Sequence, residues 1–333
     1  MTVTVTVTLR PLGTGDIPEL ARHLAAVEAV DKTGEHYSEA DLAEEFANPD
    51  IEVGKDIVGA FDGDEIVGYF AVYPRSTSGD IQQKVHVEGS VRPDRRGEGL
   101  GGLLVEAMIA RADEVHAEQH PDVPARFSLT GLSGNRAQED LLASVGMVPE
   151  RWNFVMRTQL GDGTAMPVPA TLPEGLELRR FEPSVSAAMH NAHNEAFLDH
   201  PDFTPWTEVM WKQWVTESRN FRPELSFAVV DRAAPDRVVA YLQSNEFDAY
   251  FEATGRREAF VAKVGTVRDY RGRGLAGTLL RHALRAYREA GFDEASLDVD
   301  SENPTGALGI YQRAGFEVES RWSNYALTRR PLR

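Results

Sequence analysis

Apolar and polar residues follow two different periods along the chain, and the whole pattern occurs twice. In residues 57–74 and 226–244, two apolar runs are joined by a polar turn, which predicts a pair of β-strands in each place. In residues 100–108 and 275–287, apolar residues recur at helical spacing, which predicts a helix with one buried face. A short glycine-rich loop comes directly before each of these two helices.

The two loops are the clearest sign of an internal repeat. The first lies in "VRPDRRGEGLGGLL" (residues 91–104) and the second in "VRDYRGRGLAGTLL" (residues 267–280). When Arg96 is aligned with Arg271, matching strands and helices occur on both sides of the loop. Each copy reads as strand, helical region, two strands, a strand into the loop, helix, strand, helix and strand. That order predicts an α/β fold, with a mixed sheet of α+β character in each copy.

A linker separates the two copies. Residues 161–175 contain three prolines and several small residues, a composition typical of connecting segments. We therefore expect an N-terminal domain over residues 1–160 and a C-terminal domain over residues 176–333. A chain of 333 residues is long enough for two domains of ordinary size.

Composition and charge narrow the classes of function. Hydrophobic residues make up 42% of the chain and charged residues 26%, as in globular proteins, and no apolar run could span a membrane. The N-terminus lacks the features of a secretion signal, so we expect a cytoplasmic protein. The net charge of −17 disfavours nucleic acid as a partner and favours a cationic small molecule, although it can also serve solubility alone. The absence of cysteine excludes thiolate chemistry, and the scattered histidines predict no metal site.

The glycine loops predict a site for phosphate groups. The N-terminus of a helix exposes unpaired N–H groups and a partial positive charge, and glycines let the backbone approach an anion closely. The leading arginine can add a contact to the anion or brace the loop. The second loop is predicted to hold phosphates with Arg271, Gly272, Arg273, Gly274, Leu275 and Ala276. The first is predicted to do so with Arg96, Gly97, Gly99 and Gly101, more weakly because Glu98 is acidic. A turn without a ligand is the alternative.

Two motifs together resemble a known superfamily. The pattern Arg-x-x-Gly-x-Gly/Ala between a strand and a helix is similar to the acyl-CoA loop of the GNAT N-acetyltransferases. The segment "VDSENPTGALGIYQRAGFEVE" (residues 299–319) resembles the closing motif of the same superfamily, with Asn303, Ala307, Tyr311, Gly315 and Phe316 at the family spacing. The resemblance covers nearly the whole chain as two tandem GNAT domains, and it is stronger in the C-terminal half.

The resemblance implies a cofactor and an activity. The cofactor is acetyl-CoA, with its pyrophosphate on the glycine loop and Asn303 touching its arm. The pantetheine follows the preceding strand, at Val264, Gly265, Thr266 and Val267 in the second copy and as far as Val91 in the first. The strands before and after the loop splay apart to admit it. The implied enzyme is an N-acetyltransferase, monomer or homodimer, which acts on the primary amine of a small, cationic acceptor.

Tyr311 is the predicted catalytic acid. A phenol with an ordinary pKa near ~10 stays protonated at neutral pH and can give its proton to the departing thiolate. The alternative is an aromatic side chain that only packs. In the first copy Leu142 stands at this position and cannot donate a proton, so we expect the N-terminal domain to be degenerate. Glu258 is the first candidate for the base, Glu246 and Asp300 follow, and a water molecule is equally possible.

Other functions stay open at this stage. Residues 194–214 combine aromatic side chains with carboxylates and could seat a cation, or simply pack a helix on the sheet. A non-catalytic acyl-CoA sensor would also retain both loops. Acetylation of protein amines is a third possibility, which requires a wide acceptor cleft.

Overall fold

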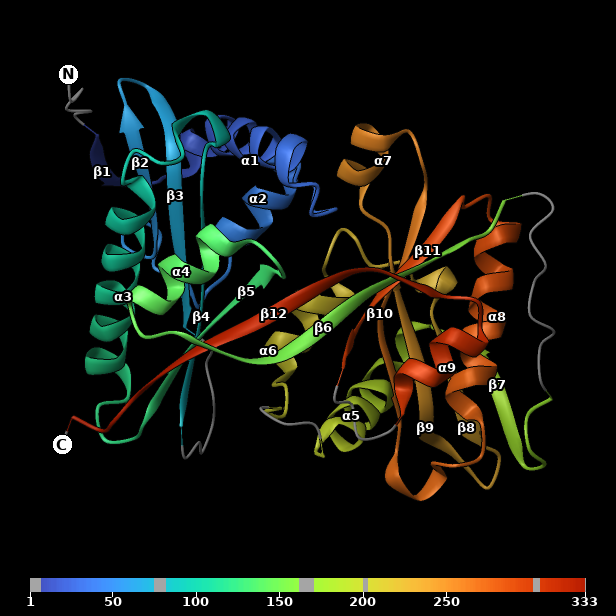
Figure 1. Ribbon diagram of the computed structural model, residues 1–333. Coiled ribbons are helices and arrows are strands. Elements are labelled where there is room, and N and C mark those ends of the chain that lie inside the picture. Colours follow the sequence, from blue (N-terminus) through green and yellow to red (C-terminus); the bar gives the residue numbers. More distant parts are fainter. Residues whose placement is uncertain (1–6, 75–81, 162–170, 200–202, 302–305, 333) are drawn as a thin grey trace. The chain divides into compact units, whose positions relative to one another are not determined.

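Figure 1 presents the computed structural model, which describes residues 7–74, 82–161, 171–199, 203–301 and 306–332. The chain forms two compact units. The N-terminal unit comprises Met1–Trp152 together with Trp322–Arg333, and the C-terminal unit comprises Asn153–Arg321. Among the described helices, none is long and apolar enough to cross a bilayer.

The N-terminal unit is a sheet covered by helices on both faces (Figure 1). Its strand order is β1-β2-β3-β4-β5-β12. The strands are β1 (Thr8–Pro11), β2 (Ile57–Asp62), β3 (Glu65–Pro74), β4 (Gln83–Val91), β5 (Ala125–Leu132) and the second half of β12 (Glu317–Arg329). The helices are α1 (Ile17–Asp31), α2 (Glu39–Phe46), α3 (Leu100–Gln119) and α4 (Arg136–Ser144). One buried cluster joins α3 and α4 to the sheet, and a second joins α1 and α2 to the opposite face.

The C-terminal unit repeats this plan with the strand order β6-β11-β10-β9-β8-β7. The strands are β6 (Val148–Gln159), β7 (Leu176–Arg180), β8 (Phe227–Asp231), β9 (Ala234–Asn245), β10 (Glu258–Thr266) and β11 (Glu294–Asp300). The helices are α5 (Ser186–Phe197), α6 (Glu208–Trp211), α7 (Asp248–Thr254), α8 (Leu275–Glu289) and α9 (Ala307–Arg313). In both units only the pair of strands around the glycine loop runs parallel, so the predicted mixed sheet is confirmed.

Alternation along β9 decides which helix covers which face. Tyr241 points toward α5, because its ring lies beside Ala196 at the site where a Cβ on Gly265 would stand. Ser244 points to the other face, where its hydroxyl lies 2.6 Å from the hydroxyl of Tyr287 on α8. Between Ala240 and Asn245, the odd-numbered residues of β9 therefore face α5 and the even-numbered ones face α8.

Each half of the repeat gives its last strand to the other unit. Residues Asn153–Gln159 of β6 pair with β11, and Met156 is fully buried in the C-terminal core. Residues Trp322–Arg329 of β12 pair with β5, and Tyr325 is buried in the N-terminal core. The domain limits predicted from the sequence differ from the compact units by this exchange. Most of the predicted linker lies outside the described residues.

Candidate active site

The two strands around the C-terminal glycine loop are paired at one end only. The parallel ladder between β10 and β11 joins Glu258–Phe260 to Glu294–Ser296 and then ends. Beyond Phe260, β10 stays paired with β9 and β11 stays paired with β6. The splayed strands leave one edge of β10 without a strand partner, and its backbone groups can therefore bond an extended ligand. The splay expected from the family resemblance is present.

A β-bulge lies where the splay begins. The register of β10 against β9 shifts between Val261 and Lys263, so that Ala262 is an extra residue without a partner opposite. A bulge of this kind turns backbone groups away from the ladder and is common beside active sites.

The loop after β10 presents free amides. Gly272 and Gly274 have φ angles of 74° and 76°, in the left-handed region that favours glycine. A Cβ at either position would have nothing within 4 Å, so the backbone is open on that side. The first intrahelical bond runs from the amide of Thr278 to the carbonyl of Gly274, at 3.0 Å. Within the described backbone, the amides of residues 275–277 have no acceptor and can bind an anion.

Arg271 braces the loop. Its Nε donates to the carbonyl of Thr266 at 3.2 Å, and one Nη donates to the carbonyl of Ala196 at 2.8 Å. The other Nη lies 2.7 Å from the Asp199 carboxylate. Of the two roles considered for this arginine, the contacts support the bracing role. Arg273 donates to the carbonyl of the loop residue Asp269 at 3.0 Å and stays at the loop surface.

The N-terminal loop has the same construction. Gly97 and Gly99 have φ angles of 82° and 88°. The Nε of Arg96 donates to the carbonyl of Val91 at 3.1 Å, and both its Nη atoms lie 2.7 Å from the Asp31 carboxylate. The parallel ladder of this unit joins only residues 83–86 to residues 125–128, so β4 and β5 splay as well.

Two further residues, Glu98 and Gly101, concern the prediction that the N-terminal loop binds phosphate groups. The carboxylate of Glu98 is engaged by Arg95 at 3.0 Å. Gly101 lies in the first turn of α3, where a Cβ would be 3.1 Å from the Leu141 side chain. The loop is thus intact, and its acidic residue is largely neutralised by its neighbour.

Some of the residues predicted to follow the pantetheine, on the strand before the C-terminal loop, are buried in the core. Others lie beside the gap between the separated strands. Val264 packs against the core, and Val267 and Leu275 are buried within it. Thr266 has a buried hydroxyl with no partner among the described residues. Gly265 is a glycine because the Tyr241 ring lies over it: a Cβ there would be 2.4 Å from a ring carbon.

Tyr241 belongs to a buried pair that the sequence did not reveal. Its hydroxyl lies 2.5 Å from Nδ1 of His193 on α5. Burial lowers the pKa of His193 to about 3, so the imidazole is neutral and accepts the phenolic proton at Nδ1. Burial raises the pKa of Tyr241 well above its ordinary value, and Tyr311 contributes to the same shift. Tyr311 therefore lies near the Tyr241–His193 pair.

Tyr311 is placed by α9, half-buried against the core with its ring 6.3 Å from that of Phe316. Burial raises the pKa of Tyr311 to about 12, so the phenol keeps its proton at neutral pH. Asn303, the predicted cofactor contact before this helix, lies outside the described residues. In the N-terminal unit the corresponding Leu142 is buried on α4 and has no proton to give.

Two of the three carboxylates considered as the base are held in ion pairs. Glu258 lies where β10 and β11 are still paired and forms an ion pair with Arg157. Burial nevertheless raises the pKa of Glu258. Glu246 is held at 2.9 Å by both Arg222 and Arg257. Asp300 is the last residue of β11.

Asp298 is a further carboxylate on the same face, which sequence reasoning missed. It stands on β11 beyond the point where the strands separate, and alternation places it on the face of Glu294 and Ser296. Its residue is exposed, yet the surrounding protein raises its pKa while the charge of Lys263 opposes the shift. The signal in the sequence was the alternation of polar residues along this strand.

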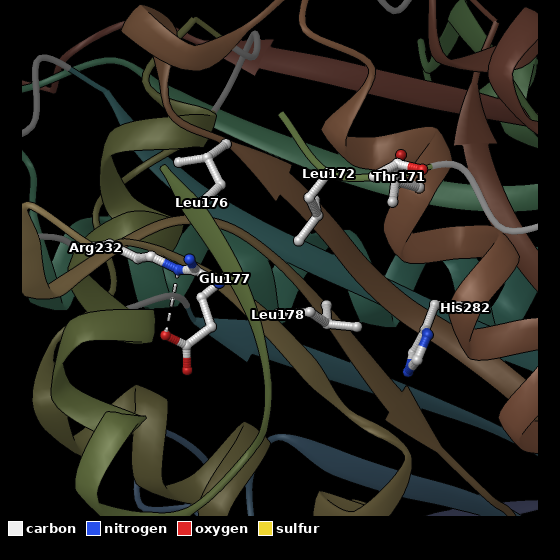
Figure 2. Close-up of a pocket in the computed structure, with 8 residues that line it drawn as sticks. Thr171, Leu172, Leu176, Glu177, Leu178, Arg232 and His282 are labelled. Atoms are coloured by element: carbon white, nitrogen blue, oxygen red, sulfur yellow. Dashed lines mark ion pairs between the residues drawn. The ribbon is translucent and has the colours of Figure 1, made fainter. Parts of the chain in front are cut away.

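A separate cavity of about 400 Å³ lies elsewhere in the C-terminal unit. Figure 2 shows Leu172, Leu176 and Leu178 around it, with His282 from α8 and the Arg232–Glu177 ion pair. None of the predicted site residues lines this cavity. Over the described residues there is also no group of three side chains suited to bind a metal ion.

Comparisons with known proteins agree on one family. The pattern of the acetyltransferase (GNAT) family matches residues 23–124 and 186–316. A mycothiol acetyltransferase of Thermobispora bispora is 32% identical over 273 residues, covering 81% of this chain and 82% of that protein. A mycothiol acetyltransferase of Nocardia farcinica is 30% identical and covers 76% of each chain.

Solved structures show the same architecture. A GCN5-related N-acetyltransferase from Sphaerobacter thermophilus has a TM-score of 0.74 and 26% identity, and covers 98% of this chain and 96% of that one. A tandem GNAT protein from the clavulanic acid biosynthesis pathway has a TM-score of 0.66 at 18% identity, covering 97% and 98% of the two chains. The second likeness supports the tandem fold alone.

Proposed function

This chain belongs to the acetyltransferase (GNAT) family and is an acetyl-CoA-dependent N-acetyltransferase, and we propose that its C-terminal unit acetylates the primary amine of a small acceptor. The observation that carries the proposal is the co-occurrence in one unit of three features: splayed strands, an open glycine loop and a protonated phenol. The N-terminal unit has the first two and lacks the third.

The residues present fit acetyl-CoA. The free amides of residues 275–277 and the open backbone at Gly272 and Gly274 suit the pyrophosphate. The unpaired edge of β10 along residues 264–267 suits the amides of the pantetheine arm. Arg271 contributes by fixing the loop to β10 and α5.

The reaction requires two proton movements. The amine nitrogen forms a bond to the thioester carbonyl carbon, and the carbon–sulfur bond breaks. Tyr311 donates its hydroxyl proton to the departing sulfur. The amine must lose a proton, and the bulge at Ala262 supports a role for backbone amides there in stabilising negative charge on the carbonyl oxygen.

A carboxylate on the α5 face of the sheet receives the proton of the amine. Glu258 is the candidate predicted from the sequence, and Asp298 is the candidate nearer the open part of the strands. The ion pair of Glu258 with Arg157 favours Asp298 for this role. We expect Asp298→Asn to change the acidic limb of the pH–rate profile, and Glu258→Gln chiefly to lower stability because Arg157 loses a partner.

The acceptor is proposed as a small-molecule amine. The relatives named mycothiol acetyltransferase support this class, since they align with most of both chains. The net charge of −17 favours a cationic acceptor.

A thiol-release assay with acetyl-CoA and a panel of small amines tests the proposal. We expect turnover by the wild type and a loss of kcat of about 100-fold in Tyr311→Phe, with the KM for acetyl-CoA within about threefold, because the phenol acts only on the leaving group. Tyr325→Phe, a buried tyrosine of the N-terminal unit, is the matched control and should retain activity. Full activity in Tyr311→Phe would refute the role of the phenol. Tight acetyl-CoA binding with no turnover of any amine would instead support an acyl-CoA sensor.

A further inference from the structure

The cavity of about 400 Å³ in the C-terminal unit has no part in the acetyl transfer proposed above. Its volume is that of a small-molecule site, since ligand pockets usually measure about 300–1,000 Å³. One wall consists of β7 and the residues just before it, and the other is α8, which contributes Thr278 and His282 (Figure 2). All of the lining residues belong to the C-terminal unit, so the cavity can be described without reference to the other unit.

Three leucine side chains, those of Leu172, Leu176 and Leu178, make the middle of the cavity apolar. Leu172 and Leu178 are half-buried: each packs against the core and keeps part of its surface open. Apolar surface that faces water in a concave site is stabilised when an apolar group covers it. The cavity therefore favours a ligand with a hydrocarbon part.

Arg232 supplies a cation with uncommitted donors at one end of the cavity. Its Nε lies 3.9 Å from the Glu177 carboxylate, which is too far for a hydrogen bond. Glu177 instead accepts a hydrogen bond from Nε of Arg179 at 3.0 Å. Among the residues that the structure describes, the Arg232 side chain donates no hydrogen bond, and 66% of it is exposed. Its guanidinium can therefore bind a carboxylate with two parallel hydrogen bonds.

His282 lies at the other end of the cavity and carries no charge. Figure 2 shows Leu178 between His282 and Arg232. The imidazole packs edge-on against the Phe227 ring, with 4.7 Å between the ring centroids. Burial lowers the pKa of His282, so the imidazole is neutral at pH 7. A charged ligand is therefore oriented by Arg232, with its hydrocarbon part toward the histidine.

The charges around the Arg232 end favour an anion. Arg232 and the neighbouring strand β7 together carry three arginines, Arg179, Arg180 and Arg232, against one carboxylate, Glu177. This local excess of positive charge occurs on a chain whose net charge is −17. A carboxylate is attracted to such an end, whereas an ammonium group is repelled.

The cavity is also separate from the region proposed for acetyl transfer. It is built on α8, which covers the face of the sheet opposite to α5, and the candidate bases for the amine lie on the α5 face. None of the residues expected to hold acetyl-CoA lines it. A ligand in this cavity is therefore neither the amine acceptor nor the cofactor.

We infer that the cavity between β7 and α8 binds a small apolar carboxylate, with the carboxylate on Arg232 and the hydrocarbon chain over the three leucines. The apolar middle accounts for the chain, and the uncommitted guanidinium accounts for the charge. The inference goes beyond the acetyl transfer proposed for this unit, because the ligand undergoes no reaction there and occupies a different place.

Isothermal titration calorimetry of the full chain tests this site, with sodium octanoate as the probe. We expect one saturable site, both without acetyl-CoA and with acetyl-CoA at saturation. Arg232→Gln should weaken octanoate binding about tenfold, because a hydrogen-bonded ion pair is lost. Leu178→Trp, which fills the middle of the cavity, should weaken it at least as much. Arg237→Gln is the matched control and should bind as the wild type does, because Arg237 lies on the same β-hairpin and pairs with Glu195 outside the cavity.

Each other outcome contradicts the inference. Octylammonium has the same chain with the opposite charge, and binding as tight as that of octanoate would indicate apolar adsorption alone. Loss of octanoate binding at saturating acetyl-CoA would place the probe in the cofactor site. Unchanged binding in Arg232→Gln, an exposed substitution whose fold circular dichroism verifies, or no saturable binding by the wild type, would remove the site. The titration measures no turnover, so its failure would leave the transferase proposal intact.

Discussion

The two units carry the same loop on the same strand-to-helix junction, and they differ in what surrounds it. In both, an arginine ties the loop to the strand and to an aspartate near the end of the first helix: Arg96 to Asp31, and Arg271 to Asp199. In both, the strands around the loop separate after a few paired residues. Only the C-terminal unit has a bulge in the strand before the loop and a phenol on the closing helix. The anchoring of the loop therefore does not depend on the bulge or on the phenol, the two features proposed to act in catalysis.

One position in the sheet shows how such a difference arises. Ser90 pairs with Tyr69 across β4 and β3, and Gly265 pairs with Tyr241 across β10 and β9. In the N-terminal unit Nε2 of His23 lies 2.8 Å from the Ser90 hydroxyl, and Tyr69 donates to Glu88 instead.

In the C-terminal unit the glycine has no hydroxyl to offer. The Tyr241 ring lies over Gly265, and the Tyr241 hydroxyl forms its hydrogen bond with His193. Two aligned differences thus accompany the change of partner: serine against glycine at this position, and Glu88 against Lys263 two residues earlier, so that the tyrosine bonds a carboxylate in one unit and an imidazole in the other.

The largest expected effect comes from cutting the chain between the two repeat copies. Residues 1–160 alone lack the β12 segment that buries Tyr325, and residues 161–333 alone lack the β6 segment that buries Met156. We expect neither fragment to unfold cooperatively when expressed by itself, because each lacks the strand that the other half contributes and its core loses large apolar side chains. Thermal unfolding followed by circular dichroism checks this.

The matched control for the cut is an N-terminal fragment that ends at residue 152 and is joined to residues 318–333 by a short glycine linker. It restores the strand next to β5 and should recover a cooperative transition. A cooperative transition in the unmodified fragment 1–160 would contradict the importance of the exchange.

The second-largest effect is expected from exchanging the residue types at Gly265 and Ser90. In Gly265→Ser the new Cβ meets the Tyr241 ring, which would be 2.4 Å away, so the ring or the strand must move. We expect a loss of about 2–3 kcal/mol in the free energy of unfolding, the usual cost of overpacking, together with a fall in turnover. The reverse change in the other unit, Ser90→Gly, should cost less than about 1.5 kcal/mol and leave turnover unchanged. Urea unfolding and the thiol-release assay measure both, and equal losses in the two variants would contradict the comparison.

The strands, helices and glycine loops that occur in both copies could be predicted from the sequence. Alternation and helical spacing identified the strands and helices, and the aligned loops placed Gly97, Gly99, Gly272 and Gly274 at positions that the structure finds at positive φ. The absence of a phenol at Leu142 was also visible in the sequence. These features depend on residues close together in the chain, and local chemistry specifies them.

Features that depend on distant partners could not be predicted. Both copies end in a strand of the same pattern, so the sequence did not tell which sheet each strand joins. Glu258 is paired with Arg157, which comes from the strand contributed by the other half of the repeat. Glu45 stands in a run of acidic residues on α2, and only the fold decides which of them turns inward toward Glu88.

A smaller effect is expected from adding one methyl group to each glycine loop. Gly274→Ala places a Cβ on a residue at φ 76°, which costs about 1 kcal/mol of backbone strain and crowds the amides that we propose to bind the pyrophosphate. We expect the KM for acetyl-CoA to rise about tenfold with kcat changed much less. Gly99→Ala, at φ 88° in the N-terminal loop, should leave both constants within about twofold. A rise in KM with the N-terminal variant and none with the C-terminal one would reverse the assignment of the catalytic unit.

The smallest effect concerns the pH dependence of stability, which should have opposite signs in the two units. The pKa of Glu45 is raised to about 7 in the folded protein, so the folded N-terminal unit holds a proton that the unfolded chain releases above about pH 4.5. Its free energy of unfolding should therefore fall as the pH rises from about 4.5 to about 7, and this loss should level off above the folded-state pKa. In the C-terminal unit, bonds from Tyr250 and Arg256 outweigh burial and lower the pKa of Glu294, so its contribution is lost instead as the pH falls.

Hydrogen exchange followed by mass spectrometry can separate the two units at each pH. Peptides from the N-terminal core should exchange faster at pH 7.5 than at pH 5, after correction for the intrinsic rate, and Glu45→Gln should abolish this difference because its side chain does not titrate. Glu39→Gln, exposed on the same helix, should preserve it. The same pH response in wild type and Glu45→Gln would mean that the carboxylate pair is balanced by a group other than a proton.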